Sequence, residues 1–140
     1  MEKIRRMNQM YDLPISEIPI PASLTKLVNF KSILVEETKE IDDIYVIADE
    51  VDRIVALADL LADVIVYCKS EALKFGIPID EVFDIVMESN FSKLGADGLP
   101  IKDERGKFLK GPNYWKPEPK IRELILRKIA EHNDRECQKL

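Results

Sequence analysis

Residues Ile54 to Cys68, IVALADLLADVIVYC, are apolar apart from two aspartates, Asp59 and Asp63. A helix that is apolar on nearly every face is typically a buried central helix, so we expect this stretch, including Cys68, to be buried. The spacing of four residues places Asp59 and Asp63 one above the other on a single helix face. Buried carboxylates are costly unless they are paired, protonated or bound to a metal. Because the stretch contains no lysine or arginine, the compensating positive charge must come from elsewhere.

A second group of acids lies upstream, in the segment EETKE that runs from Glu36 to Glu40. The surrounding periodicity predicts a helix that opens at residue 22 or 23 and continues to about residue 41. On a helical wheel of about 100° per residue, Glu36, Glu37 and Glu40 fall within roughly 100° of arc beside the apolar stripe. The three carboxylates therefore leave the helix from one flank, next to its core-facing side.

A short break separates this helix from the central one, which we expect to begin at Asp49 or Asp52 and to end at Gly76. An antiparallel hairpin of the two helices would bring the two acidic groups face to face. Carboxylates cannot converge without a cation, because like charges a few ångströms apart repel strongly in a partly dry site. Ligation by oxygen alone is typical of Mg²⁺ or Mn²⁺. The alternative for EETKE is a solvated acidic face.

The remaining chain predicts three further helices, over about residues 2–11, 80–89 and 118–133, and no internal repeat. A connector with three prolines, residues 13–21, separates the first two helices of the chain. Residues 90–119 hold four of the five glycines and four of the eight prolines, which predicts a long loop with a small β-hairpin over residues 101–109. The expected fold is an all-α helical bundle in a single domain of residues 1–140, built on the antiparallel helix pair that carries the acids.

The charge of the chain is unevenly distributed. Residues 1–90 hold 9 basic and 18 acidic side chains, whereas residues 91–140 hold 12 and 8, within a net charge of −5. An acidic first part suits cations and a mildly basic second part suits a phosphate-bearing ligand, but neither is basic enough for a duplex nucleic-acid binder. We find neither a secretory signal nor a membrane span, and therefore expect a cytoplasmic protein.

The long loop supplies candidate substrate-binding side chains. Asn90 and Lys93 lie in SNFSK, and Lys110, Tyr114 and Trp115 lie in LKGPNYWKP. Lysines and an amide can hold phosphates, and aromatic rings can stack on a base. The alternative is that the lysines are ordinary surface residues and that the tryptophan packs against the protein.

Taken together, EETKE, ADLLADVIVY and FGIPIDEVFDIV resemble the all-α nucleoside triphosphate pyrophosphohydrolase superfamily, which includes MazG, the dimeric dUTPase-like enzymes and phosphoribosyl-ATP pyrophosphohydrolase. The resemblance covers about residues 24–119. The segments SNFSKLGADGLP and FLKGPNYWKP are similar to the loop of the MazG-like, phosphoribosyl-ATP-pyrophosphohydrolase-like branch.

The resemblance implies Mg²⁺-dependent cleavage between the α- and β-phosphates of a (d)NTP, and a homodimer or homotetramer. The family's EExxE motif matches Glu36, Glu37 and Glu40, and the aspartate of its ExxD motif matches Asp63. The chain departs from ExxD at Leu60, where the family has glutamate, so Asp59 would have to act as the fourth ligand. The implied metal ligands are Glu37, Glu40, Asp59 and Asp63, with Glu36 and Glu37 as the groups that orient or deprotonate water.

Two other hypotheses remain open at this point. One keeps the fold and changes the substrate to phosphoribosyl-ATP or a modified nucleotide. The other is a non-catalytic helical bundle that binds a nucleotide or a partner, and the departure at Leu60 favours it.

Overall fold

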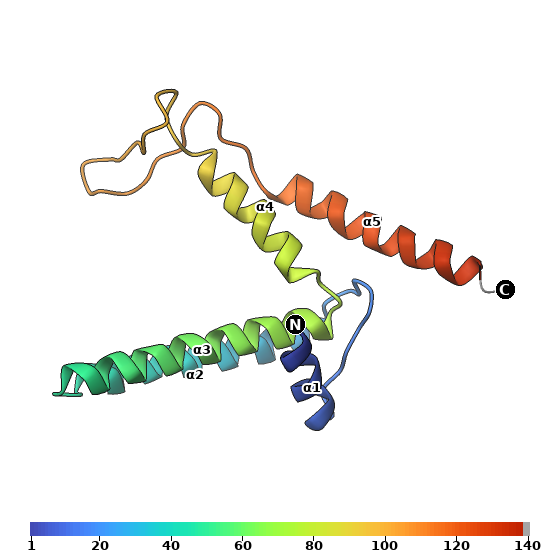
Figure 1. The fold of residues 1–140 in the computed structure, drawn as a ribbon, viewed down its shortest axis with the longest axis horizontal. Coiled ribbons are helices and arrows are strands. Elements are labelled where there is room, and N and C mark those ends of the chain that lie inside the picture. The colour runs from blue at the N-terminus through green and yellow to red at the C-terminus, as the bar shows by residue number, and fades with distance from the viewer. Residues whose placement is uncertain (139–140) are drawn as a thin grey trace. The chain divides into compact units, whose positions relative to one another are not determined.

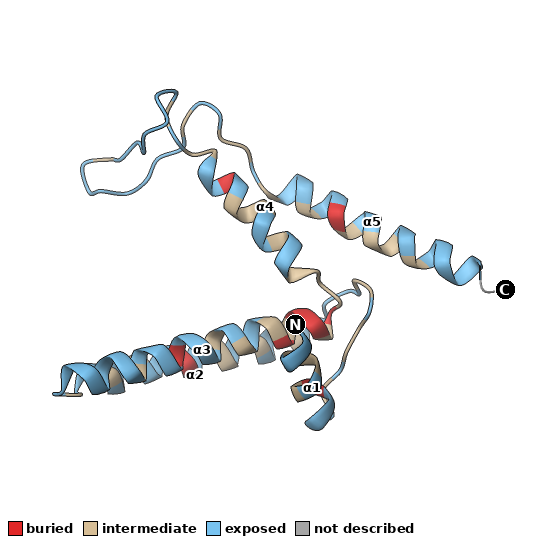
Figure 2. Cartoon of the chain, viewed as in Figure 1, coloured by how far each residue is buried: buried red, intermediate tan, exposed pale blue. Residues whose placement is uncertain are grey.

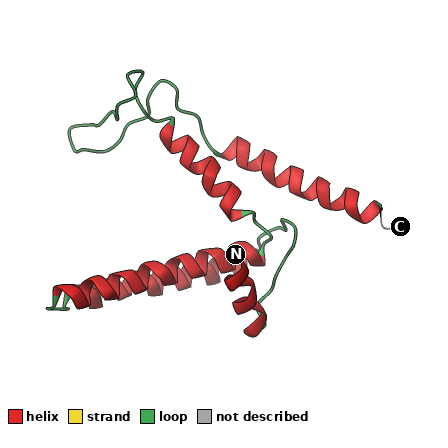
Figure 3. Cartoon of the chain, in the orientation of Figure 1, coloured by secondary structure: helices red, strands yellow, loops and turns green. Residues whose placement is uncertain are grey.

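The computed structural model describes residues 1–138 and is all-helical, with no strand among those residues (Figures 1 and 3). Its helices are α1 (Glu2–Met10), α2 (Leu24–Tyr45), α3 (Glu50–Lys74), α4 (Ile79–Phe91) and α5 (Glu118–Cys137). The predicted all-α fold is confirmed. The chain forms two compact units, Met1–Ile77 and Pro78–Leu140, and the expectation of a single domain stays a prediction. None of the helices in residues 1–138 is long and apolar enough to cross a membrane.

The helix starts predicted for the acidic hairpin are confirmed by their N-caps. Ser23 Oγ accepts a hydrogen bond from the Lys26 amide at 3.3 Å, and Asp49 Oδ1 accepts from the amides of Val51 and Asp52 at 2.9 Å each. Such caps satisfy amides that have no partner within the helix. The predicted end of α2 near residue 41 is wrong, because the helix continues to Tyr45.

In the first unit, α2 and α3 run antiparallel and side by side (Figure 1). Leu60 is only 6% exposed and lies in the seam between them. Much of α3 is less covered than expected (Figure 2). Leu61 is 55% exposed, and Cys68 is exposed rather than buried. Within one chain α2 covers a single stripe of α3, so the opposite apolar stripe is left open.

The helix α1 is anchored to α3 by a buried polar pair. Asn8 is completely buried, and its Oδ1 accepts a hydrogen bond from Ser70 Oγ at 2.8 Å. Its Nδ2 lies 3.5 Å from the Ser70 carbonyl oxygen. Because a buried amide is costly unless it is hydrogen-bonded, this pair fixes where α1 sits along α3.

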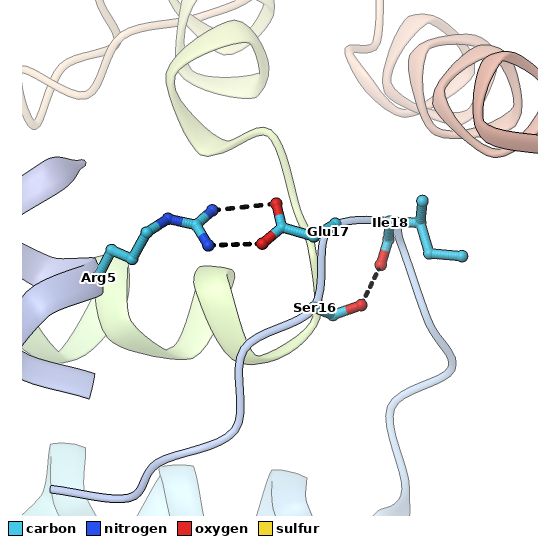
Figure 4. A network of polar contacts seen from close by, with 4 residues as sticks. All are labelled: Arg5, Ser16, Glu17 and Ile18. Atoms are coloured by element: carbon cyan, nitrogen blue, oxygen red, sulfur yellow. Dashed lines mark hydrogen bonds and ion pairs between the residues drawn. The ribbon is translucent and has the colours of Figure 1, made fainter. Parts of the chain in front are cut away.

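The proline-containing connector also lies against the end of α3. The amide of Ser16 donates to the Leu73 carbonyl at 3.0 Å. Figure 4 shows Arg5 of α1 donating to both carboxylate oxygens of Glu17, at 2.5 and 3.1 Å. In the same view Ser16 Oγ donates to the Ile18 carbonyl at 2.6 Å.

The turn that ends α3 requires glycine. Gly76 has φ +64°, and a Cβ atom at this position would collide with the carbonyl of Ile18 in the connector. A left-handed residue just after a helix is usually glycine, which agrees with the end predicted at Gly76.

In the second unit, α4 and α5 form another antiparallel pair. Lys128 Nζ lies 2.7 Å from Glu81 near the start of α4, and Lys120 Nζ lies 3.8 Å from Glu88 near its end. The buried Ser89 donates to the Trp115 carbonyl at 2.9 Å, which ties the end of the long loop to α4. The predicted hairpin over residues 101–109 is limited to one isolated antiparallel bridge, between residues 102 and 108.

Candidate active site

The acidic side chains of α2 and α3 face one another in two neighbouring layers. The first layer contains Glu37, which is 7% exposed, with Asp63 and Tyr67 of α3 close enough to perturb its titration. The second layer contains Glu40 and Asp59, which line the same cavity. The antiparallel hairpin thus brings the two acidic groups together, as the sequence predicted.

Glu37 is the most buried of the acidic side chains in this hairpin. Its Oε2 atom is buried and has no hydrogen-bond partner among residues 1–138. The pKa of the Glu37 carboxyl is raised above its ordinary value, first by burial and then by the negative charges of Glu40 and Asp63. A hydrogen bond from the Tyr67 hydroxyl opposes this rise in the pKa. A buried oxygen without a partner, surrounded by like charges, is the environment that a bound cation would relieve.

Tyr67 was not identified from the sequence. It lies one helical turn beyond Asp63, and its hydroxyl is close enough to Glu37 for each group to shift the pKa of the other. The charge of Glu37 is the largest of the influences that raise the pKa of the Tyr67 hydroxyl. The repeat of Asp59, Asp63 and Tyr67 at intervals of four residues was the signal that could have placed it on this face.

The second layer surrounds a cavity of about 260 Å³ between the two helices. Glu40 and Asp43 line it from α2, and Asp59 lines it from α3. Asp43 was also missed, because the helix was expected to end near residue 41 and Asp43 fell in the predicted break. Its spacing of three residues from Glu40 places both side chains on one face of α2.

Leu60, the residue that departs from the ExxD motif, lines the same cavity. Its side chain is buried in the seam of the hairpin, whereas the neighbouring Asp59 is exposed. The chain therefore has a core leucine at the position of the ExxD glutamate, and the carboxylate of the preceding residue, Asp59, borders the cavity.

In residues 1–138, no three His, Cys, Asp or Glu side chains are arranged so that they could hold one metal ion together. The carboxylates instead face each other across the seam, and Glu36 is exposed on the flank of α2. Two features fit an oxygen-ligated divalent cation: a donor set made of carboxylates, and the unpartnered Oε2 of Glu37. The metal itself stays a prediction.

The loop residues expected to bind substrate fall into separate groups. Lys93 Nζ donates to Asn90 Oδ1 at 2.7 Å, and both side chains line one cavity. Lys110 Nζ lies 4.5 Å from the centroid of the Tyr114 ring. Trp115 has Lys120 Nζ at 3.8 Å from its ring centroid, so a lysine already covers its ring.

The fold is similar to that of a solved structure. That structure, from Exiguobacterium sp. 255-15, is named a "putative NTP pyrophosphohydrolase". The two share 21% sequence identity with a TM-score of 0.61, over 94% of this chain and 96% of the other. No protein-family model matches the chain, and no curated protein matches it. At this identity the likeness concerns the fold, and it extends over nearly the whole of both chains.

Proposed function

We propose that the protein is a Mg²⁺-dependent nucleoside triphosphate pyrophosphohydrolase, which cleaves a (d)NTP between the α- and β-phosphates to give a monophosphate and pyrophosphate. The observation that carries this proposal is the buried Glu37, which lies beside Glu40 and Asp63 and whose Oε2 has no hydrogen-bond partner in the part of the chain that the structure describes. The similarity in fold to the structure from Exiguobacterium, together with that protein's name, supports a nucleotide as the substrate.

Glu37, Glu40, Asp59 and Asp63 are the proposed ligands of the cation. Asp43 is a further candidate, because it lines the cavity of the second layer with Glu40 and Asp59. When bound, Mg²⁺, or Mn²⁺ in its place, would neutralise phosphate charge and favour departure of the pyrophosphate group.

The exposed carboxylate of Glu36 is proposed to accept a proton from the attacking water, with Glu37 as the alternative base. The water oxygen forms a bond to phosphorus while the bridging P–O bond breaks, and pyrophosphate leaves with the bonding electrons. Tyr67 positions the Glu37 carboxylate through its hydrogen bond.

Asn90 and Lys93 are the proposed phosphate contacts, since their polar groups lie together at one cavity. Contacts from Lys110, Tyr114 and Trp115 stay predictions; in the structure, lysines lie over the rings of Tyr114 and Trp115.

A homodimer or homotetramer is proposed on the basis of the open stripe of α3. Val51, Ile54, Leu61 and Ile65 are exposed along this helix at spacings of three, seven and four residues. A contiguous apolar stripe of this kind usually marks an interface. Light scattering should give the mass of an oligomer for the natural protein and a smaller mass for Leu61→Glu.

The test of the function is pyrophosphate release from the eight common NTPs and dNTPs, with Mg²⁺ and with EDTA. Asp63→Ala should abolish release, because it removes a proposed metal ligand. Asp42→Ala is the matched control: Asp42 is exposed on α2 and lies about 200° around the helix from Glu40. This control should keep its activity.

Release that depends on Mg²⁺ and is lost only in Asp63→Ala would support the proposal and name the substrate. If the protein binds Mg²⁺ but releases no pyrophosphate from any of the eight, phosphoribosyl-ATP or a modified nucleotide becomes the substrate to test. If it neither binds Mg²⁺ nor releases pyrophosphate, the acids are structural and the enzyme proposal is wrong.

A further inference from the structure

A second cavity lies entirely within the Pro78–Leu140 unit, between the end of α4 and the long loop. Its volume is about 270 Å³. Apolar side chains make up most of its wall, among them Leu94, Ile101, Phe108 and Leu109. The polar groups at the cavity are Asn90 and Lys93 of the SNFSK segment. A mostly apolar wall with a few polar groups is typical of a small-molecule site.

Backbone hydrogen bonds hold the wall of this cavity in place. The amide of Leu109 donates to the Ile101 carbonyl at 2.8 Å, which joins two wall segments. The amide of Gly111 donates to the Lys93 carbonyl at 2.9 Å, and a Cβ atom on Gly111 would collide with the backbone of Leu94. The returning loop is therefore closely packed against the segment that follows α4, so the cavity is largely pre-formed.

The positive charge around the cavity and its apolar wall favour a ligand that carries both a negatively charged group and a flat ring. Lys93 uses one N–H to donate to Asn90 at 2.7 Å, which leaves its other N–H groups and the Asn90 amide nitrogen as donors. Lys102 Nζ lies 4.9 Å from the centroid of the Phe108 ring, so a second ammonium group stands beside the wall. A volume near 270 Å³ lies just below the usual range for ligand pockets, which suits a base rather than a complete nucleoside triphosphate.

We infer that this cavity binds the base of the nucleotide against Phe108, Ile101 and Leu109, with a phosphate held by Lys93 and Asn90. The inference rests on the proposed nucleotide substrate. It assigns base recognition to Phe108, Ile101 and Leu109 instead of to Tyr114 and Trp115, which do not line this cavity. Stacking and apolar contact tolerate different bases, so we expect this cavity to accept more than one base.

The experiment measures binding of nucleoside 5′-monophosphates to the protein of residues 1–140 by calorimetry in EDTA, where no bond is broken. Ribose 5-phosphate, which lacks the base, is measured beside them. At least one monophosphate should bind about tenfold more tightly than ribose 5-phosphate, because it adds the base contact. Phe108→Ala should lower the affinity for that monophosphate about tenfold, to that of ribose 5-phosphate.

Phe91→Ala is the matched control. Phe91 is 62% exposed, Phe108 is 61% exposed, and Phe91 does not line the cavity. It should bind the monophosphate as the natural protein does. Ile101→Ala provides a second variant of the wall and should weaken binding in the same direction, with circular dichroism used to verify that each variant is folded.

The inference is overturned if no monophosphate binds more tightly than ribose 5-phosphate, or if Phe108→Ala binds as well as the natural protein. It is also overturned if Phe108→Ala changes the oligomeric mass and leaves the affinity unchanged, which would mean that a second copy covers the cavity. Monophosphate binding that depends on Phe108, without pyrophosphate release from any triphosphate, would contradict the proposed function and leave this inference standing.

Discussion

Replacing Leu60 by glutamate tests the acidic hairpin at the residue where the chain departs from the family motif. Leu60 is 6% exposed, lies in the seam of α2 and α3, and lines the cavity with Glu40, Asp43 and Asp59. Leu60→Glu would place a further carboxylate beside three others. Leu60→Gln is the matched control, because glutamine has nearly the same shape as glutamate but carries no charge.

The size of each effect follows from burial and charge. Both substitutions lose the burial of the leucine side chain and place a polar group in the seam, which costs about 2–4 kcal/mol. In EDTA, Leu60→Glu should lose roughly 1–3 kcal/mol more, the repulsion expected between partly exposed like charges a few ångströms apart. Mg²⁺ at 100 times its dissociation constant would restore about 2.7 kcal/mol to a protein that binds it only when folded.

The assay is urea unfolding followed by circular dichroism, in EDTA and in Mg²⁺. We expect Leu60→Glu to be less stable than Leu60→Gln in EDTA, and to gain more stability from Mg²⁺ than either Leu60→Gln or the natural protein. Equal stability of the two variants in both solutions would refute the reasoning, because it would mean that the carboxylates neither repel one another nor share a cation.

Three further predictions concern the first unit and the glycines. The raised pKa of Glu37 means that the folded protein binds a proton more tightly than the unfolded chain does. The stability of the metal-free protein should therefore fall as the pH rises from 4.5 through the folded pKa of Glu37. In thermal melts, Glu37→Gln should show a weaker dependence of stability on pH. Gly76→Ala combines a left-handed backbone with a backbone collision and should cost at least about 2 kcal/mol in urea unfolding, whereas Gly106→Ala, with φ +77° and open space around it, should cost only about 1 kcal/mol. Asn8→Ala and Ser70→Ala should each cost about 1–3 kcal/mol, and the double variant should cost clearly less than their sum; additive costs would show that the two side chains do not interact.

Local chemistry made much of the fold predictable. The caps at Ser23 and Asp49 and the glycine at Gly76 mark helix ends through hydrogen bonds and backbone conformation within a few residues. Helical periodicity placed each acidic group on one helix face. Because the connection between the two helices is short, they were expected to pack as an antiparallel hairpin with the two groups facing each other. The end of α2 was less predictable, because helix termini depend on weak local preferences.

Other features depend on neighbours that periodicity does not specify. The apolar composition of α3 indicated burial. Leu61 and Cys68 nevertheless remain exposed, because α2, α1 and the connector leave one stripe of α3 uncovered. Glu37 was expected on a flank and is buried, because Tyr67 and the seam of the hairpin enclose it. Which of several carboxylates becomes buried depends on how the helices pack, and the sequence pattern alone does not specify it.

The helices, their starts, the antiparallel hairpin and the acids that it carries could be predicted from the sequence alone, since each of these depends on residues close together in the chain. Only the tertiary structure decided that Glu37 Oε2 has no hydrogen-bond partner within residues 1–138, that Asp43 and Tyr67 belong to the acidic layers, and that Asn90 and Lys93 share a cavity with Phe108. The reason is physical: desolvation, repulsion and the shape of a cavity depend on distances between atoms far apart in sequence, and these distances exist only once the helices and the loop have packed.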